Sequence, residues 1–219
     1  MSDERSSILP LYESGLTSEP LTLQEASILT VGRDEAPKKP KFRGDVRFAN
    51  PDSAGDIEAI EAINLFYWGS LDQDIFGRVY NVFDCRNLLA RPLPDEPGAL
   101  DDSIHGIAGQ VSIFEEDEGF LHIVVFNVWP QWHARGVGKK LLGFAIRECR
   151  RLGLPSIKLG TTNDNIPALY FYQRSGFVIE EVVTEEVVRG HGEPPVGYGG
   201  IPVRDEIRMR LDIGDITAM

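Results

Sequence analysis

The chain has 219 residues, 42% of them hydrophobic, which is enough to bury the core of one domain with extensions. Its formal net charge of −12 argues against a general nucleic-acid surface, because phosphate binding normally needs a basic field. No segment approaches the roughly 20 apolar residues of a membrane span or has the regions of a secretory signal, so we expect a cytoplasmic protein that binds no membrane.

The composition divides the chain into an extension and a domain. The first 42 residues combine short apolar runs with several prolines and a polar stretch, and we interpret them as an extension that packs partly against the domain. The domain is expected over residues 43–213, followed by a short tail at residues 214–219. Acidic runs at residues 95–102 and 115–118 fall in predicted loops, and we interpret them as solvated surface.

The first half of the domain should alternate strands and helices. A strand is predicted over residues 45–49, and a capped helix follows over residues 51–63. A second helix is predicted within residues 71–82. The buried side of the first helix is marked by three isoleucines: Ile57, Ile60 and Ile63.

Three strands are predicted before the middle of the chain. Two lie near residues 87–91 and 104–114. The third, LHIVVFNV over residues 121–128, has the β-branched and aromatic residues that suit a buried strand. Trp129 and Pro130 should end it.

A glycine-containing turn follows this strand and leads into an amphipathic helix. Gly136 and Gly138 carry no Cβ, so several backbone N–H groups could approach an anion at the positive end of the helix dipole. The turn lacks both the GxxxxGK motif and the third glycine of the dinucleotide fingerprint, which disfavours a nucleoside triphosphate and NAD. Taken alone, a phosphate cradle and a tight connection without a ligand are equally open.

A second motif follows a strand predicted over residues 156–160. Its helix can be capped by Asn163, Asp164 or Asn165 and closed by Gly176. The last two strands are predicted over residues 177–188 and 204–211, separated by a loop rich in glycine and proline.

Cysteine and histidine positions show no metal-ligand spacing. Cys85 and Cys149 are too few for a disulfide framework and are expected to be reduced. The four histidines are not close together in the chain, so we expect no metal dependence.

The motifs occur together in a known order. V-x-P at Val128 to Pro130, the turn ending at Gly138 and the pattern NxxAxxxYxxxGF between Asn165 and Phe177 resemble the GNAT superfamily of acyl-CoA-dependent N-acetyltransferases. The resemblance implies an α/β fold whose mixed, twisted and splayed central sheet has about seven strands flanked by helices.

The resemblance also implies acetyl-CoA as the acyl donor. The backbone of Phe126 and Val128 would pair with the pantetheine arm, and the Phe126 N–H would hold the developing oxyanion. Asn165 would combine a helix cap with a cofactor contact. His133 departs from the pattern, because family members usually have Gln or Arg there, and one expected side-chain contact is lost. The pyrophosphate would lie on the N–H groups of the turn: Arg135, Gly136, Val137, Gly138 and Lys139.

Two side chains are candidates for proton transfer. Tyr172 matches the family's general acid, and a phenol with a pKa near 10 is protonated at neutral pH. A tyrosine that only packs against the sheet is the alternative. His122 stands where the histone acetyltransferase branch has a glutamate, and a neutral imidazole could accept a proton from an ammonium. His122 precedes Phe126 by about 13 Å of ideal strand, so a water or a bulge would be needed, and a noncatalytic histidine is equally open.

The acceptor is expected beside the first helix. Tyr67 and Trp68, near Asp72 and Asp74, would suit a cationic amine, although these aromatics could simply close the core. We therefore predict an N-acetyltransferase that uses direct attack by a primary amine in a ternary complex. The alternative is a noncatalytic acyl-CoA sensor or interaction module, and transfer of a longer acyl group and a homodimer are both compatible with the sequence.

Overall fold

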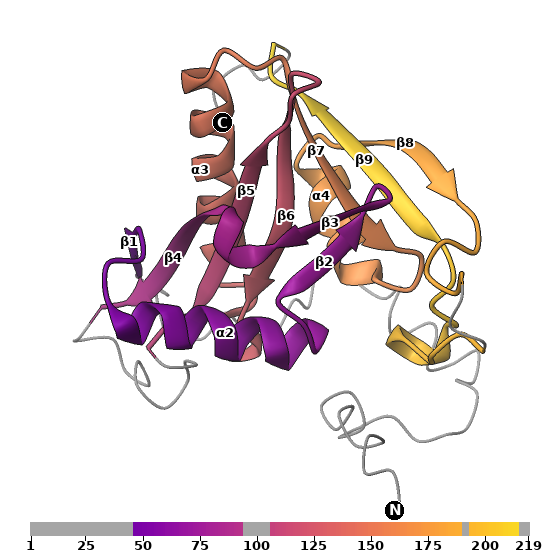
Figure 1. Cartoon of the computed structure of the whole chain (residues 1–219), viewed down its shortest axis with the longest axis horizontal. Coiled ribbons are helices and arrows are strands. Elements are labelled where there is room, and N and C mark those ends of the chain that lie inside the picture. The colour runs from indigo at the N-terminus through magenta and orange to yellow at the C-terminus, as the bar shows by residue number, and fades with distance from the viewer. Residues whose placement is uncertain (1–45, 94–105, 190–192, 215–219) are drawn as a thin grey trace, which may run out of the picture. The chain divides into compact units, whose positions relative to one another are not determined.

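Seven strands form one mixed sheet in the order β1-β4-β5-β6-β7-β9-β8 (Figure 1). The computed structural model describes residues 46–93, 106–189 and 193–214, so the predicted extension, the acidic run at 95–102 and nearly all of the tail lie outside it. β6 and β7 run parallel, and the other neighbouring strands pair antiparallel. The strands are β1 (Val46–Ala49), β4 (Arg86–Pro92), β5 (Gly109–Glu115), β6 (Leu121–Val128), β7 (Ser156–Thr162), β8 (Val178–Val183) and β9 (Glu206–Asp212). The predicted seven-stranded sheet is confirmed.

Helices cover both faces of this sheet. Figure 1 shows α2 (Ala54–Trp68) on one face, and α3 (Val137–Arg151) and α4 (Ile166–Arg174) on the other. Short 3₁₀ turns are η1 (Val82–Asp84), η2 (Pro130–Trp132) and η3 (Tyr198–Gly200). None of the helices in the described ranges is long and apolar enough to cross a membrane.

The helix α2 begins at a capping box and ends at a glycine. The Ser53 hydroxyl accepts from the Asp56 N–H at 3.2 Å, and the Asp56 carboxylate accepts from the Ser53 N–H. Gly69 ends the helix with a φ of 67°. The expected burial of Ile57 is wrong, since this side chain is 46% exposed. Residues three apart drift by about 60° around a helix, and the buried stripe follows a different set: Asp56, Ala59, Ile60, Ile63 and Asn64.

A β-hairpin replaces the second helix expected within residues 71–82. It consists of β2 (Asp72–Ile75) and β3 (Arg78–Asn81), and it lies on the same face of the sheet as α2 (Figure 1). Phe76 and Gly77 form the turn with φ values of 58° and 70°. Two consecutive residues with positive φ match the twist of a two-residue hairpin, which is why the chain reverses here.

The strands β6 and β7 separate shortly after they meet. Their pairing covers only the three positions from Leu121 to Ile123, whereas β5 pairs with β6 as far as Val128. Between these points Val124 is inserted as a bulge, because Ser112 pairs with Val125 and Ile113 with Ile123. The predicted splay of the sheet is therefore present, and it begins at the bulge.

Candidate active site

The turn between β6 and α3 presents a helix N-terminus. Gly136 stands before the first residue of α3, and the Lys140 N–H makes the first helical hydrogen bond, to the Gly136 carbonyl at 3.1 Å. The N–H groups of the three residues between them precede the helical ladder. No side chain in the described ranges caps this end. The positive end of the helix dipole therefore directs a set of backbone donors out of the helix, as an anion site requires.

The two glycines of this turn differ in backbone conformation and in surroundings. Gly136 has a φ of 80°, in the left-handed region, and an added Cβ would meet nothing within 4 Å. Gly138 is helical and faces the rings of Phe126 and Phe171, where an added Cβ would make ordinary contacts at 3.5 to 3.6 Å. The backbone conformation therefore favours glycine at position 136, whereas at position 138 the space would admit a Cβ.

The open edge of β6 lies where the resemblance put the pantetheine arm. The Trp129 N–H donates to the Ala108 carbonyl at 2.8 Å, toward β5. Main-chain groups of alternate residues point to the same edge, so those of Phe126 and Val128 point away from β5, toward the gap left by β7. An extended ligand can pair with such an edge in the manner of an added strand.

The carbonyl of Val128 already has two side-chain partners. The Tyr67 hydroxyl donates to it at 2.7 Å, and His133 Nε2 lies 2.7 Å from it. Because a carbonyl only accepts, His133 Nε2 carries a proton and donates it to this carbonyl. This bond holds His133 at the end of β6, and its contact with the cofactor stays a prediction.

Tyr172 lies against the open strand. Its ring is 7% exposed and packs with Phe126, Phe171 and Phe177 at centroid distances of 6.0, 5.3 and 5.4 Å. Burial raises the pKa of the Tyr172 phenol above its ordinary value, so the hydroxyl is protonated at neutral pH. In the same helix, the Asn165 side chain accepts from the Ala168 N–H at 3.3 Å, which confirms the predicted cap.

His122 lies on the other face of β6 from Phe126. Its ring is fully buried, with the rings of Phe76 and Tyr80 each 4.9 Å away. The bulge at Val124 reverses the alternation of side chains, so Phe126 packs on α4 while His122 packs on the hairpin. Burial lowers the pKa of His122 to about 4, although a hydrogen bond to Glu116 opposes this shift. The imidazole is therefore neutral at pH 7, and its role as a base stays a prediction.

The expectation that residues 115–118 are solvated is wrong for Glu116. This residue is 4% exposed, and its carboxylate meets Arg78, Tyr80 and His122. No local pattern indicates the burial of Glu116, because its partners on β3 lie 38 and 36 positions away in the chain.

The aromatic residues at the end of α2 tie this helix to β6. Besides the Tyr67 hydroxyl on Val128, the Trp68 indole N–H donates to the Asn127 side-chain oxygen at 3.1 Å. Trp68 is nevertheless 46% exposed. Tyr67 therefore has a structural role, whereas Trp68 offers a ring face beside the open strand.

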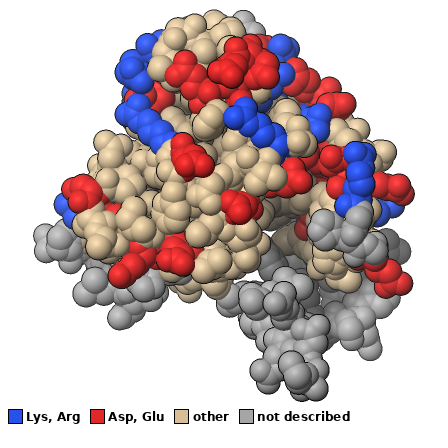
Figure 2. Space-filling view, viewed as in Figure 1, with Lys and Arg blue, Asp and Glu red and all other residues tan. Residues whose placement is uncertain are grey.

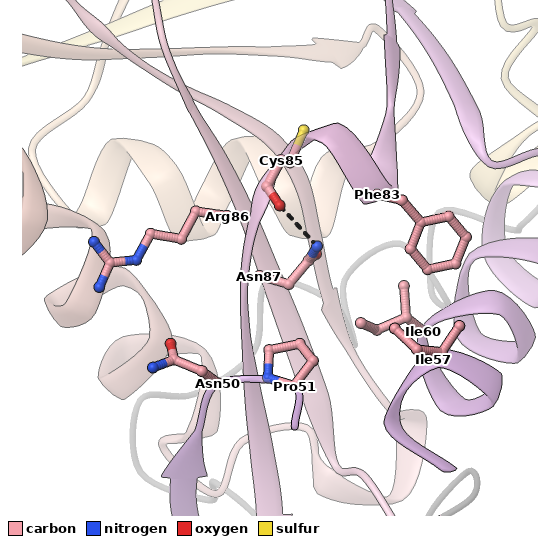
Figure 3. Close-up of a pocket in the computed structure, with 8 residues that line it drawn as sticks. All are labelled: Asn50, Pro51, Ile57, Ile60, Phe83, Cys85, Arg86 and Asn87. Atoms are coloured by element: carbon pink, nitrogen blue, oxygen red, sulfur yellow. Dashed lines mark hydrogen bonds between the residues drawn. The ribbon is translucent and has the colours of Figure 1, made fainter. Parts of the chain in front are cut away.

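A cavity of about 300 Å³ lies apart from these residues (Figure 3). It is lined by Ile57 and Ile60 of α2, by Phe83 of η1 and by the start of β4, where Asn87 donates to the Cys85 carbonyl at 3.0 Å. None of the predicted site residues lines it. Separately, the described part of the chain holds no group of three His, Cys, Asp or Glu side chains placed to bind a metal.

Sequence comparisons show similarity to one family. The model of the Acetyltransferase (GNAT) family matches residues 63–177, just over half of the chain. The uncharacterized protein YxbD of Bacillus subtilis (strain 168) is 33% identical over 146 residues, 64% of this chain and 83% of that protein. The uncharacterized N-acetyltransferase YvbK of the same strain is 31% identical over 107 residues, 49% of this chain and 68% of that protein.

Solved structures show the same fold. A Bacillus subtilis acetyltransferase in complex with CoA superposes with a TM-score of 0.59 and 24% sequence identity. The similarity covers 77% of this chain and 99% of that chain.

Proposed function

Because this chain belongs to the acetyltransferase (GNAT) family, we propose that it transfers an acetyl group from acetyl-CoA to a primary amine. One observation carries the proposal: the open edge of β6 is followed, after the short turn η2, by the uncapped N-terminus of α3, and Tyr172 lies beside that edge. A similar fold holds CoA in the Bacillus subtilis structure, and YvbK is named an N-acetyltransferase.

The donor would extend along β6 toward the turn. Its pyrophosphate would accept hydrogen bonds from the N–H groups that begin α3, with Lys139 exposed nearby to add positive charge. Its pantetheine arm would pair with the main chain of Phe126 and Val128. Since the Val128 carbonyl has two partners already, the Phe126 groups and the Val128 N–H are the ones that suit this pairing.

The reaction would proceed by direct attack in a ternary complex. The neutral amine attacks the thioester carbonyl carbon, and the N–H of Phe126 holds the oxyanion of the tetrahedral intermediate. When the C–S bond breaks, CoA leaves as a thiolate and takes the proton of the Tyr172 hydroxyl. This transfer leaves a tyrosinate, which the burial that raises the pKa of the phenol disfavours. The nitrogen of the new amide then gives its second proton to the tyrosinate, directly or through water, and this restores the phenol.

The base is proposed to be His122. Its ring is neutral at pH 7 and therefore able to accept a proton, but it is fully buried beneath the hairpin. A water between the amine and the ring, or displacement of Phe76, would complete the path. An amine that enters already neutral would not need it.

The acceptor is proposed to be cationic before it loses its proton. Trp68 offers a half-exposed ring, and Asp72 and Asp74 are exposed on the adjacent hairpin. Figure 2 shows acidic side chains spread over this face, with a dense group at the top of the view. The net charge of −12 would raise the local concentration of amines.

A reaction with a mixed library tests the function. Purified protein is incubated with acetyl-CoA and a set of amines and peptides, and CoA release and product mass are followed. We expect a product heavier by one acetyl group, with CoA released in equal amount, and no release without an acceptor. Binding of CoA without product from any acceptor would favour the noncatalytic module, for which the sealed His122 is the supporting observation. Longer acyl-CoA donors in parallel reactions measure the acyl-chain preference.

A further inference from the structure

The buried carboxylate of Glu116 lies within hydrogen-bond distance of three side chains. Arg78 Nη1 lies 2.8 Å from Oε2, the Tyr80 hydroxyl lies 2.6 Å from Oε1, and His122 Nδ1 lies 3.2 Å from Oε1. The β5–β6 turn holds the carboxylate in place, because the Glu116 N–H donates to Phe120 and its carbonyl accepts from Gly119. A buried carboxylate is tolerated when it is hydrogen-bonded in this way.

These bonds fix the tautomer of His122. The Arg78 guanidinium can only donate, and burial together with the Glu116 charge raises the pKa of Tyr80, so that its phenol keeps the proton and donates. Oε1 therefore accepts from His122, whose proton must be on Nδ1. The lone pair is then on Nε2, which is buried and has no partner among the described residues.

We infer that Glu116 is a positioning residue that forms a carboxylate–imidazole pair with His122. It holds the imidazole in the tautomer that leaves the lone pair of His122 Nε2 free. The inference rests on the proposed function and deepens it by naming what orients the base. In the reaction, Nε2 takes one proton from the ammonium of the acceptor, and the imidazolium then donates from both nitrogens. Glu116 stabilises that cation and takes no proton itself, and Nε2 returns the proton to solvent before the next turnover.

The charges around the ring support this role. The positive charge of Arg78 lowers the pKa of His122, whereas the negative charge of Glu116 raises it. On the sheet side, Lys158 stands opposite His122 in the strand pairing but bonds to Glu180. The Arg208 guanidinium of β9 lies 4.8 Å from the centroid of the Phe76 ring, and the centroid of this ring lies 4.9 Å from that of the imidazole. Glu116 is thus the anion that contacts the imidazole directly.

The ring of Phe76 adds a second sign of a constrained site. Phe76 has a φ of 58°, in the left-handed region that L-residues rarely adopt, and the centroid of its ring lies 4.9 Å from that of His122. Backbone strain of this kind persists where the surrounding structure fixes the residue. The strained turn holds an aromatic cover over the imidazole.

Nitrogen NMR of His122 in the free protein tests the orientation without any substrate. We expect the Nδ1–H tautomer in the natural protein. Glu116→Gln should lower the pH at which His122 titrates, because the anion that favours the imidazolium is gone, whereas Glu115→Gln, an exposed neighbour, should leave it unchanged. An Nε2–H tautomer in the natural protein, or a titration that Glu116→Gln does not move, overturns the inference.

The pH–rate profile tests the link to catalysis. Glu116→Gln should lower kcat/KM about 10- to 100-fold, which is a part of the roughly 10²–10⁴-fold rate increase that a general base supplies. It should also move the acidic limb of the profile to lower pH. If Glu116→Gln changes the tautomer of His122 but leaves the acidic limb of the pH–rate profile at the same pH, the positioning role is overturned. If no acceptor is ever acetylated, the proposed function fails while the NMR experiment still decides whether the pair exists.

Discussion

Tyr172→Phe separates the chemical role of this tyrosine from its packing. The ring contacts with Phe126, Phe171 and Phe177 remain in the variant, and only the hydroxyl is lost. Truncation to Ala would remove the buried ring and cost about 3–5 kcal/mol, but the isosteric change should alter the free energy of unfolding by less than about 1.5 kcal/mol. The affinity for CoA should also stay close to that of the natural protein.

The expected loss is in the rate of acetyl transfer. A general acid contributes about 10²–10⁴-fold, equal to roughly 3–5 kcal/mol of activation free energy. The assay is a single turnover with prebound acetyl-CoA, quenched on the millisecond scale, and Tyr170→Phe on the exposed side of α4 is the matched control. A Tyr172→Phe enzyme that transfers acetyl groups at the full single-turnover rate would refute the acid role.

Three further predictions concern stability. Gly136→Ala should destabilise the protein by about 1–2 kcal/mol because of its φ of 80° and weaken CoA binding in titration calorimetry, whereas Gly143→Ala inside α3 should stabilise it by about 0.5–1 kcal/mol. Since the pKa of His122 falls to about 4 from near 6.5, the unfolded chain alone binds this proton between those values. Stability should then drop by up to about 3 kcal/mol as pH falls across this window in urea denaturation, and His122→Gln should flatten the drop. Ser53→Ala should cost about 1 kcal/mol through loss of the cap, with CoA affinity unchanged.

Local patterns predicted the elements that are proposed to hold the donor. The run at residues 121–128 matches β6 in full, because β-branched and aromatic residues mark a buried strand. The turn at Gly136 and the cap at Asn165 were also predicted, since both depend on residues close in the chain. The splay came from the resemblance, and the structure explains it by a bulge that no local pattern announces.

Long-range contacts explain what the sequence could not predict. The hairpin was mistaken for a helix because its turn, Phe76–Gly77, lacks the Asn-Gly or Asp-Gly pair that usually marks such a turn. Glu116 looked like one member of an acidic loop, and only the fold brings Arg78 and Tyr80 to it. The bond from the Tyr67 hydroxyl to the Val128 carbonyl likewise joins residues that are 61 positions apart.

The bulge at Val124 has a consequence for the movement of protons. It directs His122 to the face covered by the hairpin and Phe126 to the face covered by α4, where Tyr172 lies. In the proposed reaction the acceptor gives up its proton on the first face, and the thiolate receives one on the second. The two transfers therefore take place on opposite faces of the sheet. Because the second proton of the acceptor nitrogen restores the phenol, only the imidazolium has to release a proton to solvent, and it must do so from the face that the hairpin covers.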